Sequence, residues 1–150
     1  WRIGYGIWPL DLAEKATRLN INSVSCTNTA TQYAAIEALK GPQVQIKEML
    51  KEFKERRELI VEKTNSIPGI SCNLPNGAFY TMPNIKKTGL SSKEMETLLL
   101  ENLKIASVAG TSFGKYGEGY IRFSYANSKE NISKAINRIH SYALEQKWSD

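Results

Sequence analysis

The chain has 150 residues, a hydrophobic fraction of 41% and a formal net charge of +5, which is typical of a globular protein with one core and part of another. No run approaches the roughly 18 to 20 apolar residues that a membrane-spanning helix needs. The basic residues are spread along the chain and mixed with glutamate, whereas nucleic-acid binding favours a clustered basic stripe. We therefore expect neither a membrane nor a nucleic acid as a partner.

The cysteine and histidine content disfavours a metal site. Cys26 and Cys72 are far apart in the sequence, and His140 is the one histidine, so almost no zinc ligands are present. Two cysteines without a CxxC spacing are typical of a reducing compartment, and we expect a cytoplasmic protein. The chain opens on Trp1 inside an apolar, glycine-punctuated run, from which we expect a piece of a longer protein.

The first part of the chain is predicted to be mainly helical. Residues 2–8 are expected to form a short strand or extended segment. A short helix is predicted over residues 11–19, ended by the asparagines that follow. A second helix is predicted over residues 30–39, with Thr27 or Asn28 as its N-cap and a Gly-Pro pair as its stop.

A long helix is predicted over residues 43–66. Its apolar residues recur at helical spacing, and lysine, glutamate and arginine cover the opposite side. At 1.5 Å per residue such a helix is about 36 Å long, which is enough to bridge two domains. After it, strands and helices alternate, so we place the domain boundary at this helix.

Residues 67–150 are predicted to form a compact α+β layer. Short strands are predicted over residues 70–74, 78–82, 105–108 and 120–125. The first two are separated by a Pro-Asn-Gly turn signal that is typical of a hairpin. Helices are expected to begin at Ser91-Ser92 and at Ser128. The result would be a small, mostly antiparallel sheet with helices over one side.

The strand around Arg122 carries an unusual group. Because side chains alternate along a strand, Ile121, Phe123 and Tyr125 suit the core, and Arg122 lies on the opposite face between two hydroxyl side chains. A guanidinium matches a carboxylate with two parallel hydrogen bonds. From the residues alone, Arg122 could bind a ligand's carboxylate, pair with one of the protein's own acidic groups, or face solvent.

A glycine-rich loop over residues 110–119, called the glycine loop below, precedes that strand. It is no phosphate-binding P-loop, because Lys115 is followed by tyrosine where that motif has serine or threonine. Taken alone, the glycine loop is best interpreted as a connecting turn.

Several segments together resemble one family, the class I/II aminotransferases of the aspartate aminotransferase fold type, which use pyridoxal 5'-phosphate. The segments are Trp1-Arg2-Ile3-Gly4-Tyr5, Gln32 to Leu39, Arg56-Arg57, Pro75-Asn76-Gly77-Ala78-Phe79-Tyr80, Gly110-Thr111-Ser112-Phe113-Gly114 and Tyr120-Ile121-Arg122-Phe123-Ser124. They occur in the family's order, and the resemblance covers essentially the whole chain. Such an ordered set is far more specific than any one of its members.

The resemblance implies an α/β protein with an α+β small domain. Residues 1–42 would be the end of the large cofactor-binding domain, residues 43–66 a bridging helix, and residues 67–150 the small C-terminal domain. It also implies a homodimeric enzyme that transfers an amino group between an amino acid and a 2-oxo acid. Which amino acid is preferred does not follow from these motifs.

The resemblance also implies roles for individual residues. Arg122 matches the arginine that binds the substrate's α-carboxylate, and Arg2 matches an arginine that holds the cofactor phosphate. Phe79 and Tyr80 would either line the site or pack in the core. Asn28 lies where related enzymes bring a segment of the partner subunit near the cofactor.

One expected departure concerns the catalytic lysine. The resemblance places the lysine that binds the cofactor about eight residues before Arg2, upstream of Trp1, so the chain alone is not expected to catalyse transamination. Ala109 stands where a proline is common, which would loosen the glycine loop. The same scaffold also hosts β-lyase and cyclopropane-forming synthase reactions. A further alternative is a non-catalytic interaction module that uses apolar surface in residues 1–40.

Overall fold

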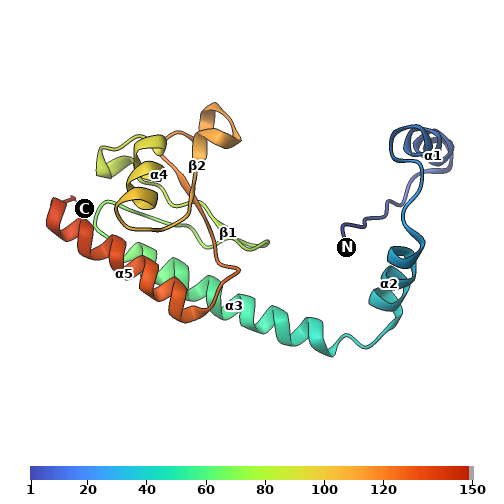
Figure 1. The fold of residues 1–150 in the computed structure, drawn as a ribbon, viewed down its shortest axis with the longest axis horizontal. Coiled ribbons are helices and arrows are strands. Elements are labelled where there is room, and N and C mark those ends of the chain that lie inside the picture. The colour runs from blue at the N-terminus through green and yellow to red at the C-terminus, as the bar shows by residue number, and fades with distance from the viewer. Residues whose placement is uncertain (149–150) are drawn as a thin grey trace. The chain divides into compact units, whose positions relative to one another are not determined.

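A computed structural model describes residues 1–148 (Figure 1). The chain divides into two compact units, Trp1–Ile46 and a second that begins at Lys47. The boundary falls near the start of the predicted bridging helix. The assignment of residues 1–42 to a larger domain stays a prediction.

The first unit consists of helix α1, Leu10–Val24, and helix α2, Thr29–Lys40. Residues 1–9 form no regular secondary structure. The predicted end of α1 near residue 19 is wrong. Asn22 Nδ2 donates to the Arg18 carbonyl at 2.7 Å, and Ser23 Oγ donates to the Leu19 carbonyl at 2.6 Å. These side chains bond one turn back along the helix, which keeps polar residues inside it.

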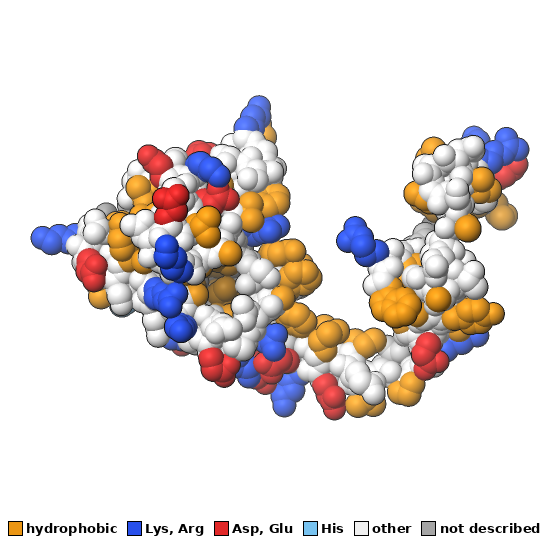
Figure 2. All heavy atoms as spheres, in the orientation of Figure 1, with side chains coloured by type: hydrophobic (Ala, Val, Ile, Leu, Met, Phe, Trp, Pro, Cys, Tyr) orange, Lys and Arg blue, Asp and Glu red, His pale blue; other side chains and the backbone are white. Residues whose placement is uncertain are grey.

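The predicted N-cap of α2 is confirmed, because Asn28 Oδ1 accepts a hydrogen bond from the Thr31 backbone N–H at 3.3 Å. Within residues 1–46, Thr31 alone is buried. Trp1, Ile7 and Leu10 are 87%, 91% and 93% exposed, and hydrophobic side chains are visible on the surface of this unit (Figure 2). Large exposed apolar patches are typical of an interface.

The long helix is confirmed as α3, Val44–Asn65. Only part of its apolar stripe is covered within the described chain. Ile60 is 3% exposed, whereas Met49 and Leu50 are 52% and 59% exposed. The C-terminal half of α3 therefore belongs to the core of the second unit, and its N-terminal half presents apolar side chains outward.

The second unit contains a three-stranded antiparallel sheet, as predicted for the small domain. Its strands are β1, Tyr80–Thr81, β2, Val108–Ala109, and β3, Ile121–Ser124. Their order is β1-β3-β2, so β3 is central. Tyr80 lies opposite Ser124, and Val108 lies opposite Arg122. The strand with the arginine thus has neighbours on both sides.

The predicted hairpin of residues 70–74 and 78–82 is wrong. In residues 70–74 only Ser71 forms a bridge, and its partner is Asn84. The Asn65 side chain accepts from the Cys72 backbone N–H at 2.7 Å and donates to the Cys72 carbonyl at 2.9 Å. Because a side chain occupies these backbone groups, the segment does not pair with the residues of β1.

Two further helices complete the unit: α4, Ser92–Glu101, and α5, Lys129–Gln146. Their predicted starts are confirmed. Ser91 caps α4 in a capping box with Glu94, and Ser128 Oγ accepts from the Asn131 backbone N–H at 3.2 Å. Between β2 and β3, the glycine loop contains two 3-10 turns, η2, Gly110–Phe113, and η3, Lys115–Gly117.

The core lies on one face of the sheet. Ile121, Phe123 and Tyr125 are 1%, 7% and 1% exposed, which confirms the predicted core face. They belong to one cluster with buried side chains of α3, α4 and α5, including Ile60, Met95, Leu99, Ile132, Ile136 and Ile139. Because residues alternate along β3, the core fixes the opposite face as the place of Arg122.

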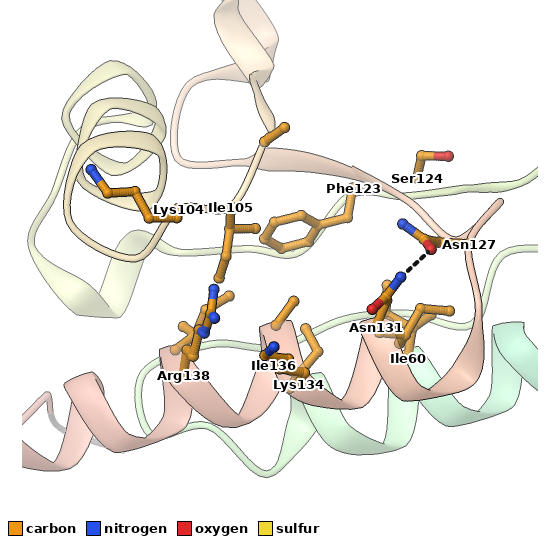
Figure 3. A pocket seen from close by; sticks show the side chains of 14 residues that line it. Ile60, Lys104, Ile105, Phe123, Ser124, Asn127, Asn131, Lys134, Ile136 and Arg138 are labelled. Carbon is orange, nitrogen blue, oxygen red and sulfur yellow. Dashed lines mark hydrogen bonds between the residues drawn. The ribbon is translucent and has the colours of Figure 1, made fainter.

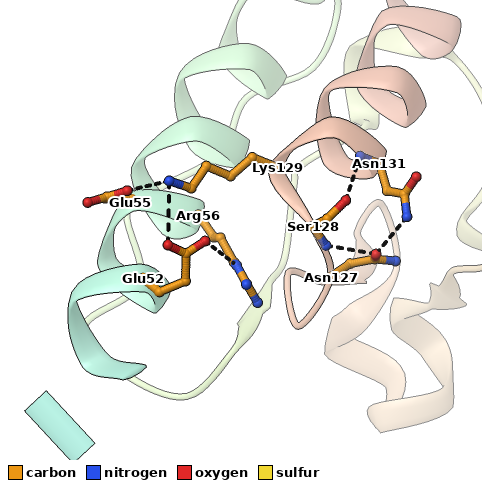
Figure 4. A network of polar contacts seen from close by, with 7 residues as sticks. All are labelled: Glu52, Glu55, Arg56, Asn127, Ser128, Lys129 and Asn131. Carbon is orange, nitrogen blue, oxygen red and sulfur yellow. Dashed lines mark hydrogen bonds and ion pairs between the residues drawn. The ribbon is translucent and has the colours of Figure 1, made fainter. Parts of the chain in front are cut away.

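Helices α3 and α5 lie side by side (Figure 1) and are joined by polar contacts. Lys129 contacts Glu55 and lies 3.5 Å from Glu52, which also pairs with Arg56 at 3.1 Å (Figure 4). Near the other end of the pair, Lys63 donates to Asn137 at 3.3 Å. These contacts hold α5 against α3.

We expect Glu55→Gln to destabilise the protein in a pH-dependent way. The hydrogen bond from Lys129, followed by its charge, holds the pKa of Glu55 below the ordinary value of 4.5. A carboxyl group with a depressed pKa contributes stability above its unfolded pKa, and this is lost as the pH falls through its folded pKa. The variant should therefore unfold more easily at pH 7, and its difference from the wild type should shrink below about pH 4.5.

Urea unfolding at several pH values checks this prediction. Glu62→Gln is the control, because Glu62 is an exposed residue of the same helix that has no ion pair within residues 1–148. A deficit of the Glu55 variant that stayed constant from pH 7 to pH 3 would contradict the ion-pair explanation. High salt should reduce the deficit at pH 7.

Candidate functional site

The Arg122 guanidinium lies against two aromatic rings. Its Cζ is 4.3 Å from the centroid of the Tyr80 ring and 4.9 Å from that of the Phe113 ring. Tyr80 comes from β1, and Phe113 comes from η2 of the glycine loop. Contacts of this length are favourable cation–π interactions. We call these three residues the Arg122 site.

The rings restrain the guanidinium but accept none of its hydrogen bonds. The ion pairs within residues 1–148 involve other cations, and Arg122 has neither an acidic partner nor a hydrogen-bond acceptor in that part of the chain. Its side chain is half-buried. The result is a partly desolvated planar cation with its fork of N–H donors free for a planar anion.

The remaining aromatic residues connect the Arg122 site to the core. The Phe79 and Tyr80 rings lie 4.4 Å apart, and Phe79 lies 6.2 Å from Phe53. Phe53 in turn lies 6.2 Å from Tyr125, whose hydroxyl donates to the Ala78 carbonyl at 2.8 Å. Tyr80 thus contacts Arg122 directly, whereas Phe79 packs against the Tyr80 ring and is itself 40% exposed. A site-lining role for either residue stays a prediction.

Sequence reasoning missed Phe113 as a contact of Arg122. The Phe113 side chain is 56% exposed, and the loop that carries it is tightly closed. A Cβ built on Gly110 would lie 2.1 Å from the Gly117 carbonyl oxygen, and one built on Gly117 would lie 2.0 Å from that of Gly110. The sequence feature that could have indicated this contact is the aromatic residue between the glycines of the loop.

Ala109, which stands where the family commonly has a proline, makes a hydrogen bond through its backbone N–H. Its backbone N–H donates to Glu96 Oε1 at 3.1 Å, a bond that a proline at this position could not make. The hydrogen bond from Lys93 and then the one from Ala109 lower the pKa of Glu96. The glycine loop therefore has an attachment to α4 at the position where looser structure was expected.

Arg2 and Asn28 belong to the first unit. Asn28 caps α2, which accounts for it locally. Arg2 lies in an exposed, irregular segment with a φ of 53°. A phosphate site normally groups several donors on one anion, and within residues 1–148 Arg2 has no hydrogen-bonded or ion-paired neighbour that would begin such a group.

A groove of about 330 Å³ lies on the other side of β3, between the strand and α5 (Figure 3). It is lined by Ile105, Phe123 and Ile136 with Lys134 and Arg138. Phe123 points to the core side of β3, so this groove is separate from the Arg122 site. None of the residues that line the groove belongs to the Arg122 site.

The two cysteines are free, with Cys26 exposed and Cys72 buried. Within residues 1–148, no three side chains of the His, Cys, Asp or Glu types group as ligands for a metal ion, and no helix is both long and apolar enough to cross a bilayer. Burial raises the pKa of the Cys72 thiol to about 11, so this thiol stays protonated and unreactive near neutral pH.

Comparison with known proteins decides the family. The family profile described as "Aminotransferase class I and II" matches residues 1–139. The chain belongs to the class I and II aminotransferases. It is 41% identical over 147 residues to an aspartate aminotransferase of Pyrococcus horikoshii, and the match covers 97% of this chain and 37% of that relative. It is 38% identical to aromatic-amino-acid aminotransferase 2 of Thermococcus litoralis, over 98% of this chain and 38% of the relative.

Solved aminotransferase structures agree in fold. The chain superimposes on an aromatic aminotransferase of Pyrococcus horikoshii with a TM-score of 0.86 and 37% identity, over 93% of this chain and 38% of that one. It superimposes on an aspartate aminotransferase of Thermus thermophilus, solved with maleate, with a TM-score of 0.85 and 29% identity, over 94% and 37% of the two chains. The aminotransferase chain described here thus spans somewhat more than a third of the length of the relatives it matches.

The family depends on pyridoxal phosphate, and the described residues do not by themselves fit this cofactor. Arg2 is the one residue with a proposed contact to the cofactor phosphate, and no further donors are grouped around it. A cofactor-binding role for Arg2 therefore stays a prediction.

Proposed function

We propose that this chain is the C-terminal portion of a pyridoxal-phosphate-dependent aminotransferase that transfers an amino group between an amino acid and a 2-oxo acid, and that Arg122 binds the substrate's α-carboxylate. The observation that carries the proposal is the restrained guanidinium of the Arg122 site, with its donors unused by the described chain. The similar Thermus enzyme was solved with maleate, a dicarboxylate, so a carboxylate ligand is within the chemistry of the family.

The contribution of Arg122 would be binding and orientation. Two parallel N–H···O bonds fix both the position and the plane of a carboxylate, and the Tyr80 and Phe113 rings fix the guanidinium before the substrate arrives. A substrate held in this way presents its Cα in a defined direction. Such orientation can lower a barrier by several kcal/mol without any chemistry at the arginine itself.

The remaining assignments follow the same proposal. Residues 1–42 would form the last part of the large domain, and residues 67–150 would form the small domain of a homodimeric enzyme. Residues 43–66 would be the helix that bridges these two domains. The exposed apolar side chains of the first unit support its packing against further protein surface. Arg2 would contribute to the cofactor phosphate site, and Asn28 would lie near the partner subunit.

The experiment that tests the function uses two chains. The 150-residue chain mixed with pyridoxal phosphate should give no stoichiometric lysine-linked adduct, read by absorbance and by mass spectrometry after borohydride reduction. A longer chain with a lysine about eight residues before Arg2 should give this adduct and should aminate a 2-oxo acid from an amino-acid donor. Release of a 2-oxo acid and ammonia without amination would instead identify a β-lyase, and a stoichiometric adduct on the short chain would overturn the proposal.

A further inference from the structure

We infer that Ser92, in the first turn of α4, is a positioning residue for the Arg122 site: its hydroxyl holds the glycine loop in the conformation that keeps Phe113 against Arg122. The inference rests on the proposed carboxylate-binding function of Arg122. It goes beyond that function because Ser92 touches neither the guanidinium nor any group that a substrate would reach.

The Ser92 hydroxyl is the centre of the contacts at the end of the glycine loop. Its Oγ donates to the Gly117 carbonyl at 3.2 Å and accepts from the backbone N–H groups of Gly119 at 2.9 Å and Tyr120 at 3.2 Å. The residue is 0% exposed, so water does not compete for these bonds. One buried oxygen thus joins three backbone groups that are 25 to 28 residues away in sequence.

Helix α4 holds the glycine loop through other groups as well. The Ser92 backbone N–H donates to Glu118 Oε1 at 2.9 Å, and the same oxygen accepts from the Gly119 N–H at 3.1 Å. Directly before the loop, at the end of β2, Glu96 Oε1 accepts from the Ala109 N–H. Both ends of the loop are therefore attached to the first two turns of one helix, and Ser92 provides most of the attachment at the second end.

The position of Phe113 depends on this attachment. The Phe113 ring is 56% exposed and is not part of the hydrophobic core, so packing alone does not fix where it lies. Its place 4.9 Å from the Arg122 Cζ follows from the backbone of the loop, which is closed by the contact of Gly110 with Gly117. Ser92 bonds directly to Gly117 and so secures that closed form.

The neighbouring Ser91 provides a matched control. Its hydroxyl accepts from the Glu94 N–H at 3.3 Å and donates to Glu94 Oε2 at 2.7 Å. Both contacts belong to the capping box at the start of α4, and neither reaches the glycine loop. Ser91→Ala therefore weakens the same helix by the loss of its cap and leaves the attachment of the loop in place.

The test follows the side-chain Nε–H resonance of Arg122 by nitrogen-15 NMR in the 150-residue chain, assigned by its disappearance in Arg122→Lys. In the wild type, the two rings should shift this resonance away from the value of a free arginine. Ser92→Ala should move it most of the way back, whereas Ser91→Ala should leave it unchanged. An unchanged resonance in Ser92→Ala, or an equal change in both variants, would overturn the inference.

Two further measurements keep the result decisive. If Ser92→Ala does not fold, Glu118→Ala removes an exposed part of the same attachment and should move the Arg122 resonance in the same direction by a smaller amount; no movement would overturn the inference. In the complete enzyme, Ser92→Ala should raise KM for the amino acid about tenfold, the scale of one buried hydrogen bond, with less change in kcat. If Arg122→Ala retained full activity, the proposed function would fail, and the NMR result would still decide the role of Ser92.

Discussion

Replacement of Arg122 by alanine in the complete aminotransferase is expected to lower kcat/KM by the equivalent of about 2–5 kcal/mol, the range for removal of one partner from a buried, hydrogen-bonded charge pair. Because 1.4 kcal/mol corresponds to tenfold, this is a loss of roughly 30- to 4,000-fold. The reason is that the carboxylate would lose both parallel hydrogen bonds and would enter a site without a compensating charge. Steady-state kinetics with several amino donors measures the effect.

The pattern across donors and variants separates this role from a structural one. Every amino acid carries the α-carboxylate, so all donors should lose about the same factor. Arg122→Lys keeps a charge without the planar fork and should fall between the wild type and alanine. Arg138→Ala is the control, since Arg138 is an exposed arginine that bonds the Leu103 carbonyl at 3.1 Å. A kcat/KM near the wild-type value in Arg122→Ala would reject the assignment.

The sequence predicts the parts of the fold that depend on local patterns. The alternation along β3 predicts the buried face, and Ile121, Phe123 and Tyr125 are buried as expected. Side-chain caps predict where helices begin, because a serine or asparagine bonds backbone groups only two or three residues away. The length of α3 follows from a periodic pattern that no glycine or proline interrupts. In each case the signal and the structure lie in the same short segment.

The predictions that failed depended on which side chains form hydrogen bonds with backbone groups. Residues 70–74 have the composition of a strand, but the Asn65 side chain takes both backbone groups of Cys72. Helix α1 continues through polar residues because Asn22 and Ser23 bond back to earlier carbonyls, a choice that composition leaves open. A single sequence does not reveal which of these hydrogen bonds forms.

In the candidate site too, a local sequence pattern predicts one feature, and hydrogen bonds between distant residues determine the other. The placement of Arg122 away from the core follows from alternation along one strand. Its contact with Phe113 does not, because that contact requires the glycine loop to fold back on α4 through bonds that span 25 to 28 residues. Local reasoning therefore identifies the charged group, and only the structure shows which residues hold it in place.

Gly117→Ala is expected to produce the largest loss of stability among simple changes in the glycine loop. A Cβ at this position would lie 2.0 Å from the Gly110 carbonyl oxygen and 2.3 Å from its carbonyl carbon. Both are backbone atoms, so no side-chain rotation relieves the overlap and the two halves of the loop must separate. We expect the free energy of unfolding to fall by about 3 kcal/mol, the upper part of the usual range for overpacking.

Urea unfolding of the chain measures this loss, with Gly77→Ala as the matched control. A Cβ on Gly77 meets no atom within 4 Å, so the control adds the same methyl group without a clash. Separation of Gly110 from Gly117 should also free Phe113, so the Arg122 resonance should move in Gly117→Ala as it does in Ser92→Ala. A Gly117 variant as stable as the Gly77 variant would mean that the loop closes in another way, and the ring contact of Arg122 would then need a different explanation.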